Sequence, residues 1–166
     1  MINMPKLDRI DINILAELQQ HGRMTNTQLA DRVGLSASPC LSRVKRLENA
    51  GYIYSYSANI NLTKLGDTQI VFTSVTLTDH RRTDFVKFES GIRAYEEVLE
   101  CHLVSGGFDY LVKFVVRNVH HYQEVIEAIL ESNIGVTKYF SYIVIKSPIV
   151  GAHAPIRSLF ARNPNF

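Results

Sequence analysis

The sequence predicts an α+β protein in which three short helices precede a domain built from four strands and two helices. Two observations carry this prediction. Up to about residue 50, apolar residues recur every three or four positions, which is the spacing of amphipathic helices. After residue 68, apolar runs with the two-residue period of strands alternate with helical runs in the order β-α-β-β-α-β. We therefore expect two domains.

The expected domain boundaries lie where the spacing of the apolar residues changes. We assign residues 1–52 to the helical domain, 53–67 to a hinge strand or linker, 68–147 to the mixed domain and 148–166 to a tail. Tyr52, Tyr54 and Tyr56 alternate with Ile53 and Ser55, which predicts a short strand in the hinge. The tail is proline-rich. Two interpretations stay open for it: it docks on an assembly, or it is disordered.

Composition limits the class of protein. The small net charge of +2 lies in residues 1–63, and residues 64–166 are balanced, a weak indication of an anionic partner for the first domain. Cys40 and Cys101 are far apart without a CxxC motif, so we expect reduced thiols, no metal and no cofactor. The sequence has neither a secretion signal nor an apolar run of the ~20 residues that span a bilayer. A cytoplasmic protein without a membrane partner is expected.

The first helix is predicted from Leu7, Ile10, Ile14 and Leu18, which fall on one stripe. Asp8 and Asp11 lie in its first turn, where carboxylates complement the positive end of the helix dipole.

The next two helices are predicted from their end signals. Thr25 and Gln28 form a capping box, and Gly34 permits the positive φ of a sharp turn. Ser36 or Ser38 is expected to cap the following helix, with Pro39 in its first turn. Two short helices joined by such a turn predict a helix-turn-helix, here of the winged type.

The third helix, expected over about residues 39–49, has a buried side formed by Cys40, Val44 and Leu47. Its other sides carry hydroxyl groups and cations suited to phosphates and base edges. The candidate DNA-binding residues are Ser36, Ser38, Pro39, Ser42, Arg43, Lys45 and Arg46. A solvated surface helix is the plain alternative, but the ordered combination of caps, turn and cationic face favours DNA binding.

The second domain is predicted element by element. Strands are expected over residues 69–77, 98–104, 110–116 and 136–146, and helices over 83–95 and 119–131. In the second strand, Leu99, Cys101 and Leu103 are expected on one face. This order is the ferredoxin-like βαββαβ pattern, with both helices on one face of an antiparallel sheet. A homodimer would cover the other face and would match a helix-turn-helix that reads two half-sites.

The segment Ser105–Asp109 allows two interpretations. Its glycines suit a plain hairpin turn, which the spacing alone favours. Exposed backbone groups beside the carboxylate of Asp109 would also suit the ammonium and carboxylate of a free amino acid.

The chain resembles the Lrp/AsnC family of transcriptional regulators over nearly its full length. The resemblance rests on segments of both domains: 7–11, 14–15, 22–23, 29–36, 39–48, 51–53, 100–106 and 108–111, the second-domain segments being closest to the leucine-responsive branch. It implies a helix-turn-helix, a hinge strand, an effector domain, and homodimers that assemble into octamers or similar species. It also implies an amino-acid effector held between dimers near a Gly-Asp loop.

The residues of that effector site are carried over by position. They are Gly106, Gly107, Phe108, Asp109, Tyr110 and Ser141. Ser141 stands where the family usually has threonine, and Gly107 stands where close leucine-responsive members tend to have an acidic residue. The resemblance therefore does not name the effector.

These observations predict a sequence-specific DNA-binding regulator of amino-acid metabolism genes that is nucleoid-associated and responds to a small amino acid. One alternative is an architectural protein that wraps DNA with low sequence specificity. A second alternative is an enzyme or metal sensor, for which the candidate groups are Asp109, His102, His120, His121 and Cys101. These groups show no nucleophile–base pairing and poor geometry for a metal, so we do not expect an enzyme.

Overall fold

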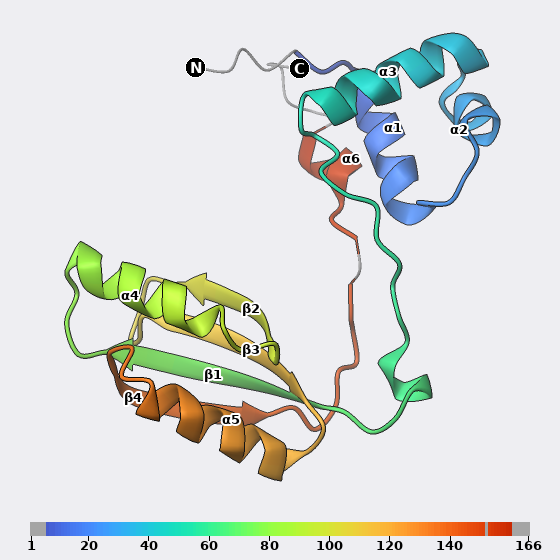
Figure 1. Ribbon diagram of the computed structural model, residues 1–166. Coiled ribbons are helices and arrows are strands. Elements are labelled where there is room, and N and C mark those ends of the chain that lie inside the picture. Colours follow the sequence, from blue (N-terminus) through green and yellow to red (C-terminus); the bar gives the residue numbers. More distant parts are fainter. Residues whose placement is uncertain (1–5, 152, 161–166) are drawn as a thin grey trace. The chain divides into compact units, whose positions relative to one another are not determined.

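The computed structural model describes residues 6–151 and 153–160, which form two units (Figure 1). The first contains the described residues up to Ile60 together with those from Ile149 onward, and the second is Asn61–Pro148. Each unit has its own hydrophobic core, so the two are treated separately. None of the helices within the described residues is long and apolar enough to span a membrane.

Capping boxes fix the first two helices of the first unit. The Asp8 carboxylate accepts the N–H of Asp11 at 2.9 Å, and the Asp11 carboxylate accepts the N–H of Asp8 at 3.0 Å. Thr25 and Gln28 form the predicted box in the same way, at 3.2 and 2.9 Å. The three helices are α1 (Arg9–Gln20), α2 (Asn26–Val33) and α3 (Ala37–Asn49).

The turn between α2 and α3 follows the prediction, with one difference at the start of α3. Gly34 has φ 72°, the left-handed conformation that glycine adopts readily. The Asn26 Nδ2 donates to the carbonyl of Ala37 at 2.8 Å and so ties the two helices together. Because α3 begins at Ala37, it is two residues longer than predicted. Ser36 lies at the N-cap position, but its hydroxyl group makes no capping hydrogen bond.

The core of the first unit lies between the three helices. Its buried apolar side chains come from all three helices and from Leu7, two residues before α1: Leu7, Ile12, Ile14, Leu29, Ala30, Cys40 and Leu47. The predicted buried side of α3 is confirmed, because Cys40 and Leu47 are 0% exposed and Val44 packs against them.

The predicted hinge strand over Tyr52–Tyr56 is wrong. The N–H of Tyr52 bonds the carbonyl of Leu47 at 2.9 Å, and Gly51 has φ 75°, so this backbone closes the end of α3. In the described residues 52–60 no strand forms, and Tyr54 is 93% exposed. Alternating tyrosines indicate a strand only where a neighbouring strand is available to pair with them.

The described part of the tail docks on α1. A short helix, α6 (Ile156–Phe160), places Ile156 against the core of the first unit. Arg157 donates from Nη2 to Glu17 Oε1 at 2.6 Å and from Nε to Asn13 Oδ1 at 3.2 Å.

Removing this contact should weaken the first unit in a pH-dependent way. The hydrogen bond from Arg157, together with that from Arg32, holds the pKa of Glu17 below its ordinary value of 4.5. A lowered carboxyl pKa stabilises the fold above the unfolded pKa, and the effect is lost as the pH falls through the folded pKa. Arg157→Ala should therefore cost about 0.5–1 kcal/mol of unfolding free energy at neutral pH and less in strong acid, where only the hydrogen bond to Asn13 is lost. Denaturant titrations at both pH values test this, with the exposed Arg23→Ala as the control.

The second unit is an antiparallel sheet with two helices. Its elements are β1 (Gln69–Leu77), α4 (Arg82–Ile92), β2 (Val98–Leu103), β3 (Tyr110–Val116), α5 (Val119–Glu131) and β4 (Val136–Ile143), preceded by a short 3-10 helix, Leu62–Lys64. The strands lie in the order β2-β3-β1-β4, and every neighbouring pair is antiparallel. This confirms the ferredoxin-like prediction.

Both helices cover the same face of this sheet (Figure 1). Buried residues of α4, such as Phe88, and of α5, such as Ile126, share one core with Val71 and Val112 of the central strands. Because side chains alternate along a strand, the neighbouring residues of β1 and β3 point to the opposite face, which no helix in the described part of the chain covers.

The prediction that Leu99, Cys101 and Leu103 share one face of β2 is wrong in part. The register against β3 shifts between Val98 and Glu100, so a bulge interrupts the alternation. Cys101 packs against the core, whereas Leu99 is 59% exposed. The extra residue of the bulge changes the face on which the side chains before it lie. The spacing of apolar residues in the sequence does not reveal the bulge.

Gly91 allows α4 to approach the loop before β4 closely. A Cβ atom at this position would lie 2.4 Å from Cγ2 of the buried Ile134. Gly91→Ala should therefore cost about 1–3 kcal/mol through overpacking, despite the better helix propensity of alanine. Gly107→Ala is the matched control, because a Cβ there meets nothing within 4 Å. Equal melting temperatures for the two variants would contradict this.

Candidate nucleic-acid interface and effector loop

The outward side of α3 carries polar groups that have no partner among the described residues. At about 100° per residue, Ser38, Ser42 and Lys45 share one side of the helix, opposite the buried Leu47. All three are exposed, and their side chains make no hydrogen bond or ion pair with any part of the chain that the structure describes. Leu41, 43% exposed, lies beside them. We call Ser38, Leu41, Ser42 and Lys45 the outer stripe.

The two predicted arginines lie on the flank of α3 and bind carboxylates of α1. Arg43 Nη1 donates to Asp8 Oδ2 at 2.7 Å and to Asp11 Oδ1 at 2.8 Å, and Arg46 Nη2 donates to Asp11 Oδ2 at 2.6 Å. The Asp11 side chain is 1% exposed, while those of Arg43 and Arg46 are 27% and 44% exposed. We call these four residues the acid–arginine cluster.

The cluster shifts the pKa values of Asp8 and Arg43 in opposite directions. The hydrogen bonds that Arg43 donates to Asp11, and then to Asp8, raise the pKa of Arg43. Burial alone would raise the pKa of Asp8, but the N–H of Asp11 and the guanidinium of Arg43 outweigh it and lower that pKa. The guanidinium groups thus serve first to brace α3 against the start of α1. Sequence reasoning missed this use, because 32–35 residues separate the partners.

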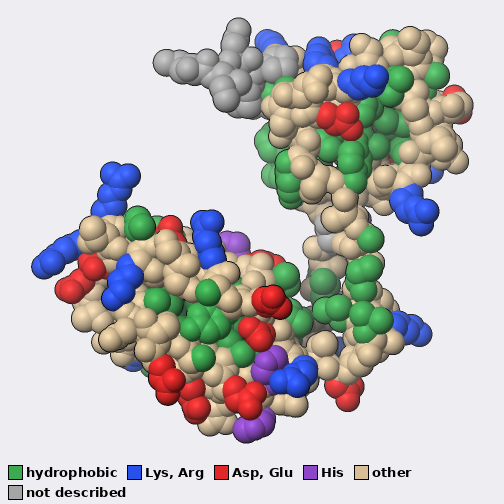
Figure 2. Space-filling model, viewed as in Figure 1, with side chains coloured by type: hydrophobic (Ala, Val, Ile, Leu, Met, Phe, Trp, Pro, Cys, Tyr) green, Lys and Arg blue, Asp and Glu red, His purple; other side chains and the backbone are tan. Residues whose placement is uncertain are grey.

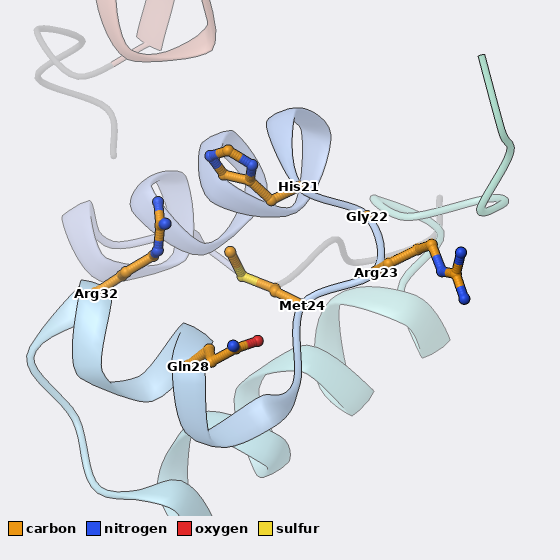
Figure 3. Close-up of a pocket in the computed structure, with 6 residues that line it drawn as sticks. All are labelled: His21, Gly22, Arg23, Met24, Gln28 and Arg32. Atoms are coloured by element: carbon orange, nitrogen blue, oxygen red, sulfur yellow. The ribbon is translucent and has the colours of Figure 1, made fainter. Parts of the chain in front are cut away.

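A surface cavity of about 430 Å³ lies at the corner between α1 and α2 (Figure 3). It is lined by His21, Gly22, Arg23, Met24, Gln28 and Arg32. Arg32 is paired with Glu17 at 3.0 Å, and Figure 3 shows the guanidinium of Arg23 pointing away from that of Arg32. The cations of this corner therefore do not converge on one anion.

The predicted effector loop connects β2 to β3, and Asp109 holds it in place. The Asp109 Oδ2 accepts the N–H of Leu77 at 2.8 Å, and Oδ1 lies 3.0 Å from Nε2 of His80. The Asp109 side chain is only 16% exposed. Gly106 and Gly107 are exposed at the tip of the loop, and Phe108 is half-buried.

The structure separates two predicted effector residues from the loop tip. Tyr110 is 2% exposed, and its hydroxyl donates to Glu89 Oε1 at 2.8 Å beneath α4. Ser141 lies on β4 opposite Thr73, two strands away from β3. Its hydroxyl bonds that of Tyr122, which also bonds Thr73. Within one chain, Ser141 and the loop tip therefore do not form a common site.

Groups considered for metal or catalytic chemistry are also dispersed. Cys101 packs against the core, while His102 points to the other face and lies 3.2 Å from Glu100 Oε2. His121 pairs with Glu97 at 3.2 Å. Among the described residues, no group of three or more His, Cys, Asp or Glu side chains is arranged to hold a metal ion.

Comparison with known proteins matches both units. Residues 7–54 match the family model described as a winged helix-turn-helix DNA-binding domain, and residues 70–152 match that of the Lrp/AsnC ligand binding domain. The chain is 43% identical to the transcriptional regulatory protein DoeX of Halomonas elongata over 86% of its length and 90% of that protein's length. It is 44% identical to the leucine-responsive regulatory protein of Escherichia coli, covering 84% and 85% of the two chains.

Solved structures agree with this result. A transcriptional regulator from Neisseria meningitidis, determined in complex with L-methionine, superposes with a TM-score of 0.85 at 33% identity, covering 92% of this chain and 99% of that one. An AsnC family regulator from Agrobacterium tumefaciens gives the same TM-score and coverage at 26% identity.

Proposed function

Because the chain belongs to the Lrp/AsnC family of transcriptional regulators, we propose that it binds operator DNA through the outer stripe of α3 and that an amino acid controls this binding. The observation that carries the proposal is a set of exposed hydroxyl and ammonium groups on α3 of a helix-turn-helix, none of which is paired within the part of the chain that the structure describes. The second helix of this motif is the one that enters the major groove.

The outer stripe has the chemistry that this role requires. The hydroxyl groups of Ser38 and Ser42 suit base edges or phosphate oxygens, and Lys45 supplies a cation for the phosphate backbone. Arg46, whose side chain is 44% exposed, adds positive charge at the flank. The remaining predicted residues, Ser36 and Pro39, are exposed at the start of the helix.

The second unit supports a homodimer. Its helix-covered face is strongly charged: Figure 2 shows blue side chains around α4 and red side chains around α5. The open face of the sheet carries the ion pair between Lys113 and Glu100 and a set of apolar side chains: Ile70, Phe72, Leu111, Val115, Phe140 and Tyr142. Phe140 and Tyr142 are 53% and 57% exposed. A patch of this kind marks an interface, so a second copy would bury it and pair two reading helices. Dimers would assemble further, into an octamer or a similar species.

An amino-acid effector is supported by two relatives. One is named for its response to leucine, and a solved neighbour was determined with L-methionine. We propose that such an effector changes the assembly state, and with it the spacing of the reading helices. Couplings of this kind are typically worth ~1–3 kcal/mol.

Lys45→Ala tests the outer stripe. We expect roughly tenfold weaker binding to operator duplex selected from random DNA, and a salt dependence of log K that is flatter by about 1, because one phosphate contact is lost. Fluorescence anisotropy at several salt concentrations measures both quantities. Lys87→Ala on α4 removes the same charge from the other unit and should leave both unchanged. If Lys45→Ala and Lys87→Ala behave alike, the stripe does not contact DNA.

A further inference from the structure

The short helix α6 makes the second unit an insertion within the first. The described residues of the first unit end at Ile60 and resume at Ile149, so the chain joins the two units twice. One connection runs through residues 54–60, and the other runs from β4 to α6. Residues 153–160 lie beyond both segments that match the family models, 7–54 and 70–152. The pattern that defines the family therefore does not account for α6.

The first connection does not fix the orientation of the two units by itself. The described residues 54–60 form neither helix nor strand, and all of them are exposed. Domains joined by such a segment are expected to move relative to each other unless a further contact restrains them. A second point of attachment would supply that restraint.

The helix α6 packs against α1 through apolar and polar contacts (Figure 1). Ile156 packs on the core of the first unit, and Arg157 Nη2 donates to Glu17 Oε1 at 2.6 Å. Just before the helix, the side-chain amide of Gln19 is placed to exchange two hydrogen bonds of 2.9 Å with the backbone of Ala154. These contacts attach the end of the second connection to α1.

Both connections meet at this attachment. A groove of about 380 Å³ on the first unit is lined by residues of α1, by residues 52–57 and Asn59, and by His153 and Ile156. The chain therefore leaves the first unit and re-enters it at one place on α1. While α6 is docked, both connections are held at this place, and once α6 is released only the first connection remains.

The contact of α6 has the features of a reversible one. With five residues, α6 is far shorter than the ~12–15 residues that an isolated helix needs, so it depends on docking. Leu159 is 58% exposed, and the Arg157 side chain is 50% exposed. Release would leave the ion pair between Glu17 and Arg32, at 3.0 Å, in place. Because the tail belongs to the same chain as its target, its effective concentration is on the order of millimolar, and a weak contact is sufficient.

We propose that α6 is a reversible latch that fixes the reading helix α3 of each subunit relative to the second unit. This inference rests on the proposed operator binding by a homodimer. Docked latches would restrict the dimer to half-sites at one spacing, because the two reading helices then have one separation. Released latches would allow other spacings, since each reading unit would hang on its first connection alone.

Two serine substitutions in α6 form a matched pair for the test. Ile156→Ser removes the side chain that packs on the core, and Leu159→Ser changes an exposed residue of the same helix. Limited digestion of the full-length protein with trypsin, followed by mass spectrometry, measures cleavage after Arg157. We expect cleavage to be roughly tenfold faster in Ile156→Ser and unchanged in Leu159→Ser, because trypsin cuts the released tail.

Fluorescence anisotropy then compares three duplexes. They are an operator selected from random DNA, the same operator with two base pairs inserted between its half-sites, and a single half-site. The insertion rotates one half-site by about 70° relative to the other. It should weaken binding of the wild type and of Leu159→Ser by roughly a hundredfold, and of Ile156→Ser by roughly tenfold or less. All three proteins should bind the single half-site equally.

Each other outcome is decisive. If trypsin cleaves Ile156→Ser no faster than the wild type, or if the released variant keeps the wild-type penalty for the insertion, α6 is not a latch. Equal weakening of Ile156→Ser on all three duplexes would also overturn the proposal, because α6 would then serve only the stability of the first unit. If the wild type binds a scrambled duplex as tightly as the operator, the proposed operator binding itself fails, and the latch fails with it.

Discussion

Asp11→Ala is expected to destabilise the first unit by about 3 kcal/mol and to abolish operator binding. The Asp11 side chain is 1% exposed and accepts hydrogen bonds from both arginines of the acid–arginine cluster. Removing one partner of a buried ion pair typically costs ~3–5 kcal/mol. The lower end applies here, because the arginines retain partial contact with water. The variant also loses half of the capping box at the start of α1.

Denaturant unfolding and operator titration measure the two effects. Asp31→Ala is the matched control, because Asp31 is exposed on α2 and its carboxylate has no partner among the described residues. If Asp11→Ala unfolds at the same denaturant concentration as Asp31→Ala, the cluster does not brace α3.

The cluster also changes how an Arg43 variant should be interpreted. From the sequence, Arg43 reads DNA, and Arg43→Ala weakens binding for that reason alone. In the structure Arg43 also holds Asp8 and Asp11, so loss of binding would equally follow from a displaced α3. Lys45 has no such second role, which makes it the sharper probe of the outer stripe.

Phe88→Ala is expected to destabilise the second unit by about 3–5 kcal/mol, the usual cost of truncating a buried phenylalanine. Phe88 is 0% exposed, and its ring centroid lies 4.5 Å from that of Tyr110. The ring therefore helps to hold α4 against the core of the second unit. Calorimetry should show that the transition of the second unit moves to lower temperature while that of the first unit stays in place.

Val86→Ala controls for side-chain truncation on the same helix, because Val86 is 54% exposed. It should shift the transition little. A Phe88→Ala variant that melts with the wild type would show that α4 does not depend on this contact.

Much of the fold could be predicted because its signals are local. The box of Thr25 and Gln28, the turn at Gly34 and the run Tyr110–Val116 each depend on neighbouring residues. The predictions were wrong where the local structure depends on residues that are distant in the sequence. Tyr54 has the pattern of a strand but pairs with no strand of the described residues, and the bulge after Val98 depends on how β2 fits β3.

The same distinction applies to the sites. The position of the reading helix follows from local caps and turns, so the sequence places the hydroxyl groups of its outer stripe on an exposed face. The use of Arg43 depends on carboxylates more than thirty residues away, so it has no local signal. Ser141 was carried over from the family pattern, and one chain alone does not bring it to the loop.

The most direct test of sequence-specific regulation compares two duplexes of equal length at the same salt concentration. One is an operator selected from random DNA, and the other is its scrambled version. Sequence-specific binding predicts that the wild type binds the operator at least about 10³-fold more tightly. Equal affinity for the two duplexes would contradict this account and would indicate a protein that wraps DNA without reading its sequence.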